Sequence, residues 1–237
     1  MPTELTARLK NDNWDLHQIA ERGPTPGALI KGTMPKPGYS DSLAQGLLIH
    51  RALDHATQGI KDKRPDLGAL IKPDQAFAPY LEADLDFLGV DTAGITATPG
   101  TQRFIDAIGA RADDPCYLFG LHYVRLGACN GNRFVARKLR SVYGFSDNQG
   151  TMFLDPFGEK QRSEWNAFKN GIDALDLSQD DQDRIFAGTR DAYLLTINLD
   201  HDEFQSAEAL LAANAKTLDK DAFEQGHSVH VAPGETL

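Results

Sequence analysis

The 237-residue sequence has no long apolar run, and no segment reaches the roughly 18 uninterrupted apolar residues that a membrane helix needs. Its start, MPTELTARLKNDNW, has no apolar core after a basic stretch, so we expect no secretory signal there. Positive charge is also scarce: 24 Lys and Arg against 34 Asp and Glu give a formal net charge of −10. Because an acidic protein gains nothing from counterion release at phosphates, we expect no nucleic acid and no anionic membrane as a partner.

Cysteine is equally rare, and Cys116 and Cys129 form no metal or redox motif. Reduced cysteines fit a cytoplasmic location best. Apolar residues at 41% and charged residues at 24% are ordinary globular values, and the chain is long enough to bury a core without disulfides. Strand-like alternation and hairpin turns between β-branched runs are missing, so the composition favours a helical protein.

Helical periodicity is what the sequence does contain. Phe77, Leu81, Leu85 and Leu88 fall on one helix face, and Ser178 before QDDQD is typical of a capped helix start. Clusters of Pro and Gly such as 23–27 and 144–158 separate the helices without forming a domain linker. We predict one all-α domain over residues 1–225 with a loose tail at 226–237. Besides helices around 77–88 and from 178 onward, the pattern predicts helices over 4–22, 40–57, 100–111, 117–142 and 161–174.

The first helix carries one candidate binding site. Lys10 and His17 are two helical turns apart, and Glu21 follows His17 at i+4, so all three share a side of one continuous helix. Histidine is a common axial ligand of haem iron, a nearby carboxylate can orient it, and a lysine can meet a haem propionate. An ordinary surface histidine on an amphipathic helix is the alternative interpretation.

A second candidate lies in the helix predicted over 117–142. Gly127 and Gly131 sit at i and i+4, although each glycine costs a helix about 1 kcal/mol relative to alanine. Together they remove side-chain bulk from one face, which allows a flat group to approach or the helix to bend. Close helix–helix packing explains the pair equally well.

Several segments then resemble the haem oxygenase family in order along the chain. His17-Gln18-Ile19-Ala20-Glu21 is similar to the family's proximal H-x-x-A-E segment. Four further segments are similar to the helices that follow, and the similarity runs over about residues 5–200. Those segments are 28–54, 78–89, 121–139 with its Gly-x-x-x-Gly, and the aromatic and Phe-Lys-containing stretch within 157–175.

The resemblance implies an all-helical bundle that holds haem between a proximal and a distal helix. His17 is then the iron ligand, with Glu21 beside it, and Gly127 and Gly131 lie over the haem. The reaction consumes O2 and electrons from a donor such as a ferredoxin or a reductase, and it releases biliverdin, CO and ferrous iron. The remaining haem-contacting residues expected from the resemblance are Lys10, Tyr123, Arg133 and Lys169.

Ala128 departs from the family pattern, since many members have an aspartate that organises distal water at this position. Alanine has no hydrogen-bonding side chain, so we expect Asn130 and Asn132, or an arginine such as Arg125 or Arg133, to orient water instead. Two alternatives stay open: a haem-binding or haem-transfer protein without turnover, and a non-haem relative that acts on a small metabolite.

Two other patterns have ordinary explanations. A di-iron site needs Glu-x-x-His pairs on facing helices, and the pair Glu224 and His227 is interrupted by Gly226 at the edge of the tail. A basic cluster could dock an acidic electron donor, or simply complement the dipole at a helix end. That cluster consists of Arg133, Arg137, Lys138 and Arg140.

Overall fold

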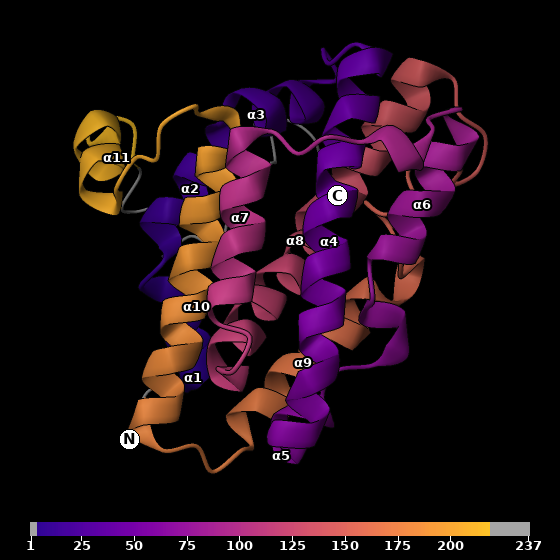
Figure 1. Ribbon diagram of the computed structural model, residues 1–237. Coiled ribbons are helices and arrows are strands. Elements are labelled where there is room, and N and C mark those ends of the chain that lie inside the picture. Colours follow the sequence, from indigo (N-terminus) through magenta and orange to yellow (C-terminus); the bar gives the residue numbers. More distant parts are fainter. Residues whose placement is uncertain (1–3, 219–237) are drawn as a thin grey trace.

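The computed structural model describes residues 4–218, and this part of the chain consists of helices and loops without a strand (Figure 1). It confirms the all-α prediction. The expected tail at 226–237 lies outside the described residues. The α-helices are α1 (Leu5–Asn11), α2 (Trp14–Arg22), α3 (Pro24–Lys31), α4 (Lys36–Lys63), α5 (Pro65–Gly68), α6 (Ala78–Phe87), α7 (Pro99–Ala110), α8 (Pro115–Tyr143), α9 (Gln161–Asp173), α10 (Gln179–Ile197) and α11 (Ala207–Asn214). Four short 3-10 helices accompany them: η1 (Pro73–Gln75), η2 (Thr92–Gly94), η3 (Gly158–Lys160) and η4 (Asn198–Asp200).

Local sequence signals set several helix ends. The Ser178 side chain accepts a hydrogen bond from the backbone N–H of Asp181 at the start of α10, as the sequence predicts. Asp114 caps α8 by accepting from the N–H of Tyr117, and Pro115 takes the first helical position. At the other end of α8, Gly144 has a φ of 71°, the left-handed conformation in which glycine commonly stops a helix.

The helices α8 and α10 pack closely enough for their backbones to touch. A Cβ atom placed on Gly188 of α10 would lie 2.0 Å from the carbonyl oxygen of Tyr117. On α8, a Cβ atom on Gly120 would lie 2.2 Å from the carbonyl oxygen of Ile185. Glycine is therefore required at both positions, and the main core surrounds this crossing. Fully buried members of that core include Leu53, Ile60, Phe77, Phe104, Phe119 and Ile185.

The N-terminal region differs from the prediction of one helix over 4–22. The helix is interrupted at Asp12 and Asn13. There the buried Asn13 side chain donates a hydrogen bond to the carbonyl oxygen of Leu9. Lys10 and His17 therefore lie on different helices, α1 and α2, and the prediction that they share one side of a continuous helix is wrong. The break predicted at 23–27 is confirmed at Gly23 alone, because Pro24 fits the first turn of α3 and residues 24–27 are helical.

The loop between α8 and η3 is tied to α6 by a buried carboxylate. Asp84 accepts hydrogen bonds from the backbone N–H groups of Met152 and Phe153, both at 2.8 Å. Burial raises the pKa of Asp84 to about 6, although the two donors act to lower it. Among residues 4–218, no helix combines the length and the apolar character needed to cross a membrane.

Candidate functional site

His17, the candidate iron ligand, lies on α2 beside the carboxylate of Glu21, as the sequence predicts. The Nε2 atom of His17 is 3.4 Å from Oε1 of Glu21, one helical turn further on. The Trp14 ring stacks on the imidazole with a centroid distance of 4.9 Å and an angle of 14° between the planes. With 30% of the His17 side chain exposed, the ring is held but still accessible.

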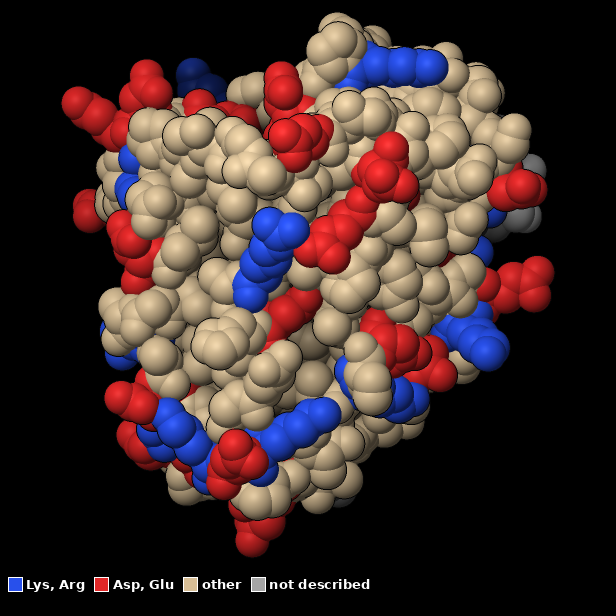
Figure 2. All heavy atoms as spheres, turned by 45° about the vertical axis from the view of Figure 1, so that its right-hand side comes forward, with Lys and Arg blue, Asp and Glu red and all other residues tan. Residues whose placement is uncertain are grey.

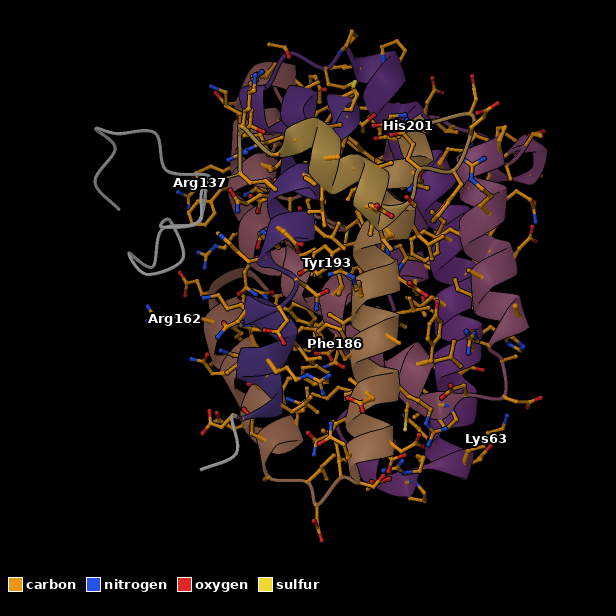
Figure 3. The ribbon with its side chains drawn as sticks, turned by 90° about the vertical axis from the view of Figure 1, so that its left-hand side faces the viewer. Lys63, Arg137, Arg162, Phe186, Tyr193 and His201 are labelled. Atoms are coloured by element: carbon orange, nitrogen blue, oxygen red, sulfur yellow. The ribbon has the colours of Figure 1, made fainter. Side chains whose placement is uncertain are left out.

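Tyr193 of α10 connects this histidine to the distal helix. Its ring meets His17 edge-on, with the centroids 5.6 Å apart. Burial raises the pKa of Tyr193 above its usual value, and the nearby Tyr123 and Glu21 raise it further. Tyr193 therefore lies between α2 and α8, near the centre of the face seen in Figure 3.

On the distal side, Gly127 faces a flat aromatic group. A Cβ atom on Gly127 would lie 3.1 Å from Cη2 of Trp165, a side chain of α9. The Tyr123 ring lies 5.1 Å from the Trp165 ring, and the Lys169 ammonium lies 5.7 Å above it. The structure thus brings Gly127, Tyr123 and Lys169 together around Trp165, whose ring lies in the space left by the missing glycine side chain.

The other residues of the distal segment are arranged along α8. The Asn130 amide donates to the carbonyl oxygen of Gly127 at 2.9 Å and accepts from Gln161 at 3.3 Å. Gly131 and Asn132 are half-buried, and Ala128 is exposed. Arg133 is also half-buried, and its guanidinium lies 5.5 Å from the ring of Phe134.

Arg125 points away from the Gly127 face, because residues two apart on a helix are separated by about 200°. Its guanidinium lies 4.7 Å above the Phe104 ring and donates to the Thr196 hydroxyl at 3.2 Å. Burial lowers its pKa to about 10. Lys10 is exposed in the last turn of α1.

The two buried histidines belong to the core. His122 shares a 3.1 Å hydrogen bond with the Gln75 side chain, and burial lowers its pKa to about 4. Burial likewise holds the pKa of His50 well below its usual value, and its ring packs edge-on against Phe77 and Phe153. Within residues 4–218, no group of three or more His, Cys, Asp or Glu side chains could hold a metal ion. Glu224 and His227 lie outside the described residues.

The donor set of α2 fits a haem iron. An imidazole with a carboxylate beside it is a residue pair that suits axial ligation of haem iron. The aromatic rings of Trp14, Tyr193 and Trp165 provide flat apolar surface of the kind a porphyrin requires. The residues present, His17 with Glu21 beside it, are thus of the type that would hold a haem group.

Sequence reasoning did not assign three aromatic side chains to this site. Trp14 had a local signal, because it precedes His17 by three residues on the same helix. Tyr193 and Trp165 come from α10 and α9, and no spacing in the sequence reveals that these helices meet α2 and α8.

Comparisons with known proteins identify the family and the fold. The heme oxygenase family model matches residues 3–202. Heme oxygenase-2 of the cyanobacterium Synechocystis, solved with heme and NO, has a TM-score of 0.77 at 21% identity, covering 94% of this chain and 91% of that one. Heme oxygenase-1 of Synechocystis, solved with heme, has a TM-score of 0.74 at 19% identity over 94% and 99% of the two chains. Heme oxygenase of Leptospira interrogans has a TM-score of 0.75 at 17% identity over 83% and 98%. These structural similarities concern the fold, and no curated protein sequence matches the chain.

Proposed function

The chain belongs to the haem oxygenase family, and on that premise we propose that it binds haem through His17 and opens it oxidatively to biliverdin, CO and ferrous iron. One observation carries the proposal: the imidazole of His17 is paired with Glu21 and stands between Trp14 and Tyr193 on the α2 side of the site. This is the arrangement of a histidine ligand whose orientation is fixed by a carboxylate.

On the proximal side, the Glu21 carboxylate beside the imidazole would orient the ring and raise the basicity of the ligating nitrogen. When bound, haem supplies the oxygen-activating chemistry, and the protein supplies ligation, orientation and exclusion of water. On the distal side, Gly127 and Gly131 would let the α8 backbone come close to a bound haem, because neither position carries a side chain.

The remaining expected contacts extend this proposal around the porphyrin edge. Tyr123 and Lys169 adjoin Trp165, so Lys169 can meet a propionate as a point charge. Lys10 and Arg133 are proposed to meet the same carboxylates. Asn130 and Asn132 are proposed to orient distal water in place of the aspartate that Ala128 replaces.

Electrons must come from a partner, for which we propose a ferredoxin or a reductase. A cytoplasmic location agrees with the state of Cys116 and Cys129, which are both buried and form no disulfide.

A haem-binding or haem-transfer protein without turnover is the second candidate. The observation that favours it is the shortage of polar side chains on α8 that could hold water. The side chain of Ala128 has no polar atom, and the Asn130 side chain is already hydrogen-bonded to Gly127 and Gln161. An α8 segment with few polar groups to hold water would still bind haem. It would deliver protons to the bound oxygen poorly, so turnover would be lost.

The experiment that separates these functions is an absorbance titration with one equivalent of hemin, followed by ascorbate in air with catalase present. Loss of the Soret band with growth of a biliverdin spectrum establishes turnover. A stable band of histidine-ligated haem, unchanged also with ferredoxin and its reductase, establishes the binding protein. If hemin does not bind, both candidates are wrong and a non-haem function on this fold is indicated.

A further inference from the structure

The helix that covers the outside of α2 lies beyond the part of the chain that matches the family. That match ends at residue 202, whereas α11 runs from Ala207 to Asn214. Figure 1 shows α11 beside α2 at the edge of the bundle, and Figure 3 shows it crossing in front of the neighbouring helices. The helix that bears His17 is therefore enclosed between α10 on one side and α11 on another.

The contact between α11 and α2 is apolar and tightly buried. Leu210 is 4% exposed and packs in one cluster with Leu16 (0%), Ile19 (6%) and Ile197. On a helix, positions 16 and 19 lie roughly opposite positions 17 and 21. Leu210 therefore packs against the back of α2, the side opposite the one that bears His17 and Glu21.

A polar contact supports the same interface at the end of α2. The Arg22 guanidinium donates to the carbonyl oxygen of Thr217, shortly after α11 ends. Arg22 also donates to the Gln18 side chain at 3.2 Å. The C-terminal end of α2 is thus connected to the chain that follows α11.

The connection from α10 to α11 is itself held in place. The buried Asn198 side chain donates to the carbonyl oxygens of Leu194 and Gln205 and accepts from the N–H of Gln205. Arg103 of α7 donates to the carbonyl oxygens of Asn198, His201 and Asp202. Because this loop is fixed to the bundle, α11 is held in a defined position against α2.

A helix as short as α2 needs such support. It has nine residues between the break at Asn13 and Gly23, and isolated helices of this length are unstable in water. Tyr193 touches the His17 ring and also packs against the cluster that contains Leu210, so the cluster and the imidazole share a neighbour.

We propose that α11 is a brace that positions the histidine helix, with Leu210 and Arg22 as positioning residues for the axial ligand. This inference rests on the proposed haem binding. The brace fixes α2 against α10, and so it fixes where the imidazole of His17 stands relative to α8. Loosening the brace lowers the fraction of molecules whose His17 is placed to ligate iron, and apparent haem affinity falls by that fraction.

The test compares Leu210→Ala with Leu67→Ala, a matched truncation of a fully buried leucine in α5. Hydrogen exchange of the α2 amides is measured in the haem-free protein, and hemin affinity is measured by absorbance titration. We expect Leu210→Ala to raise both the α2 exchange rates and the hemin Kd about tenfold or more. We expect Leu67→Ala to leave both near wild type, Arg22→Gln to act like a milder Leu210→Ala, and Leu210→Met to restore most of the affinity.

Unchanged α2 exchange in Leu210→Ala overturns the brace. An equal rise in the hemin Kd for Leu67→Ala also overturns it, because the effect would then follow general stability. Faster α2 exchange with unchanged hemin affinity overturns the link to the ligand. If wild-type protein fails to bind hemin, the proposed function is wrong, whereas the exchange experiment still decides whether α11 braces α2.

Discussion

The Nε2 atom of His17 lies 3.4 Å from Oε1 of Glu21, one turn further along α2. This pair follows from helical spacing, so the two residues stay neighbours as long as α2 is helical. Its orientation toward a ligand depends on other helices, since Tyr193 of α10 meets the imidazole edge-on.

Replacing Glu21 by Gln keeps the shape of the pair and removes its charge. We expect hemin to bind Glu21→Gln about 10–100 times more weakly, because the ligating nitrogen becomes less basic and its ring less firmly oriented. The iron–histidine stretching frequency, measured by resonance Raman spectroscopy, should fall. The exposed carboxylate of Glu82 on α6 provides the control, and Glu82→Gln should leave both quantities unchanged. Wild-type affinity and frequency in Glu21→Gln would show that the carboxylate does not act on the ligand.

Gly127 and Gly59 offer a matched pair of helical glycines. A Cβ atom at Gly59 of α4 meets nothing within 4 Å, whereas at Gly127 it lies 3.1 Å from Trp165. Gly59→Ala should therefore stabilise the protein by up to about 1 kcal/mol. Gly127→Ala should stabilise the protein by less than this. Gly127→Val should lower the free energy of unfolding by about 1–3 kcal/mol through overpacking, and it should bind hemin more weakly. Urea unfolding and hemin titration measure these effects, and equal gains at both glycines would contradict the close approach to Trp165.

The crossing of α8 and α10 depends on the absence of a side chain at Gly188. An alanine there would place its Cβ atom 2.0 Å from the carbonyl oxygen of Tyr117, so the helices must move apart. We expect Gly188→Ala to lower the free energy of unfolding by about 1–3 kcal/mol or more. The control is Gly109→Ala in α7, where the added atom meets nothing within 4 Å. Similar unfolding curves for the two variants would mean that the crossing is looser than described.

Asp84 should give the stability of the protein a particular pH dependence. Its pKa is about 6 when buried, compared with 3.8 as its ordinary value, so the folded state keeps this proton after the unfolded chain has lost it. The contribution of Asp84 to the free energy of unfolding therefore falls as the pH rises from about 4 to about 6. Asp84→Asn removes this dependence. It should also destabilise the protein by about 1–3 kcal/mol, because the Asn amide nitrogen cannot accept from the N–H of Met152 or Phe153.

Urea unfolding at several pH values tests the expectation for Asp84. The difference in unfolding free energy between wild type and Asp84→Asn should narrow from pH 4 to pH 6. The exposed Asp86, on the same helix, provides the control variant Asp86→Asn. A difference that stays constant across this range would contradict the raised pKa of Asp84.

The sequence by itself determined the features that depend on neighbours along the chain. Helical periodicity predicted the helix over 117–142, which the structure shows as α8, and Ser178 marked the start of α10. Spacing also paired His17 with Glu21, because residues four apart on a helix must be adjacent. The ordered motifs identified the family, which the match over residues 3–202 confirms.

Only the tertiary structure decided what faces these residues. The break at Asn13, which separates Lys10 from His17, is made by a buried side chain that bonds back to Leu9. Trp165 against Gly127 and Leu210 against the back of α2 join residues from helices far apart in the sequence. Such contacts depend on how whole helices pack, and many amphipathic helices share the same periodicity, so no local pattern specifies which apolar faces meet.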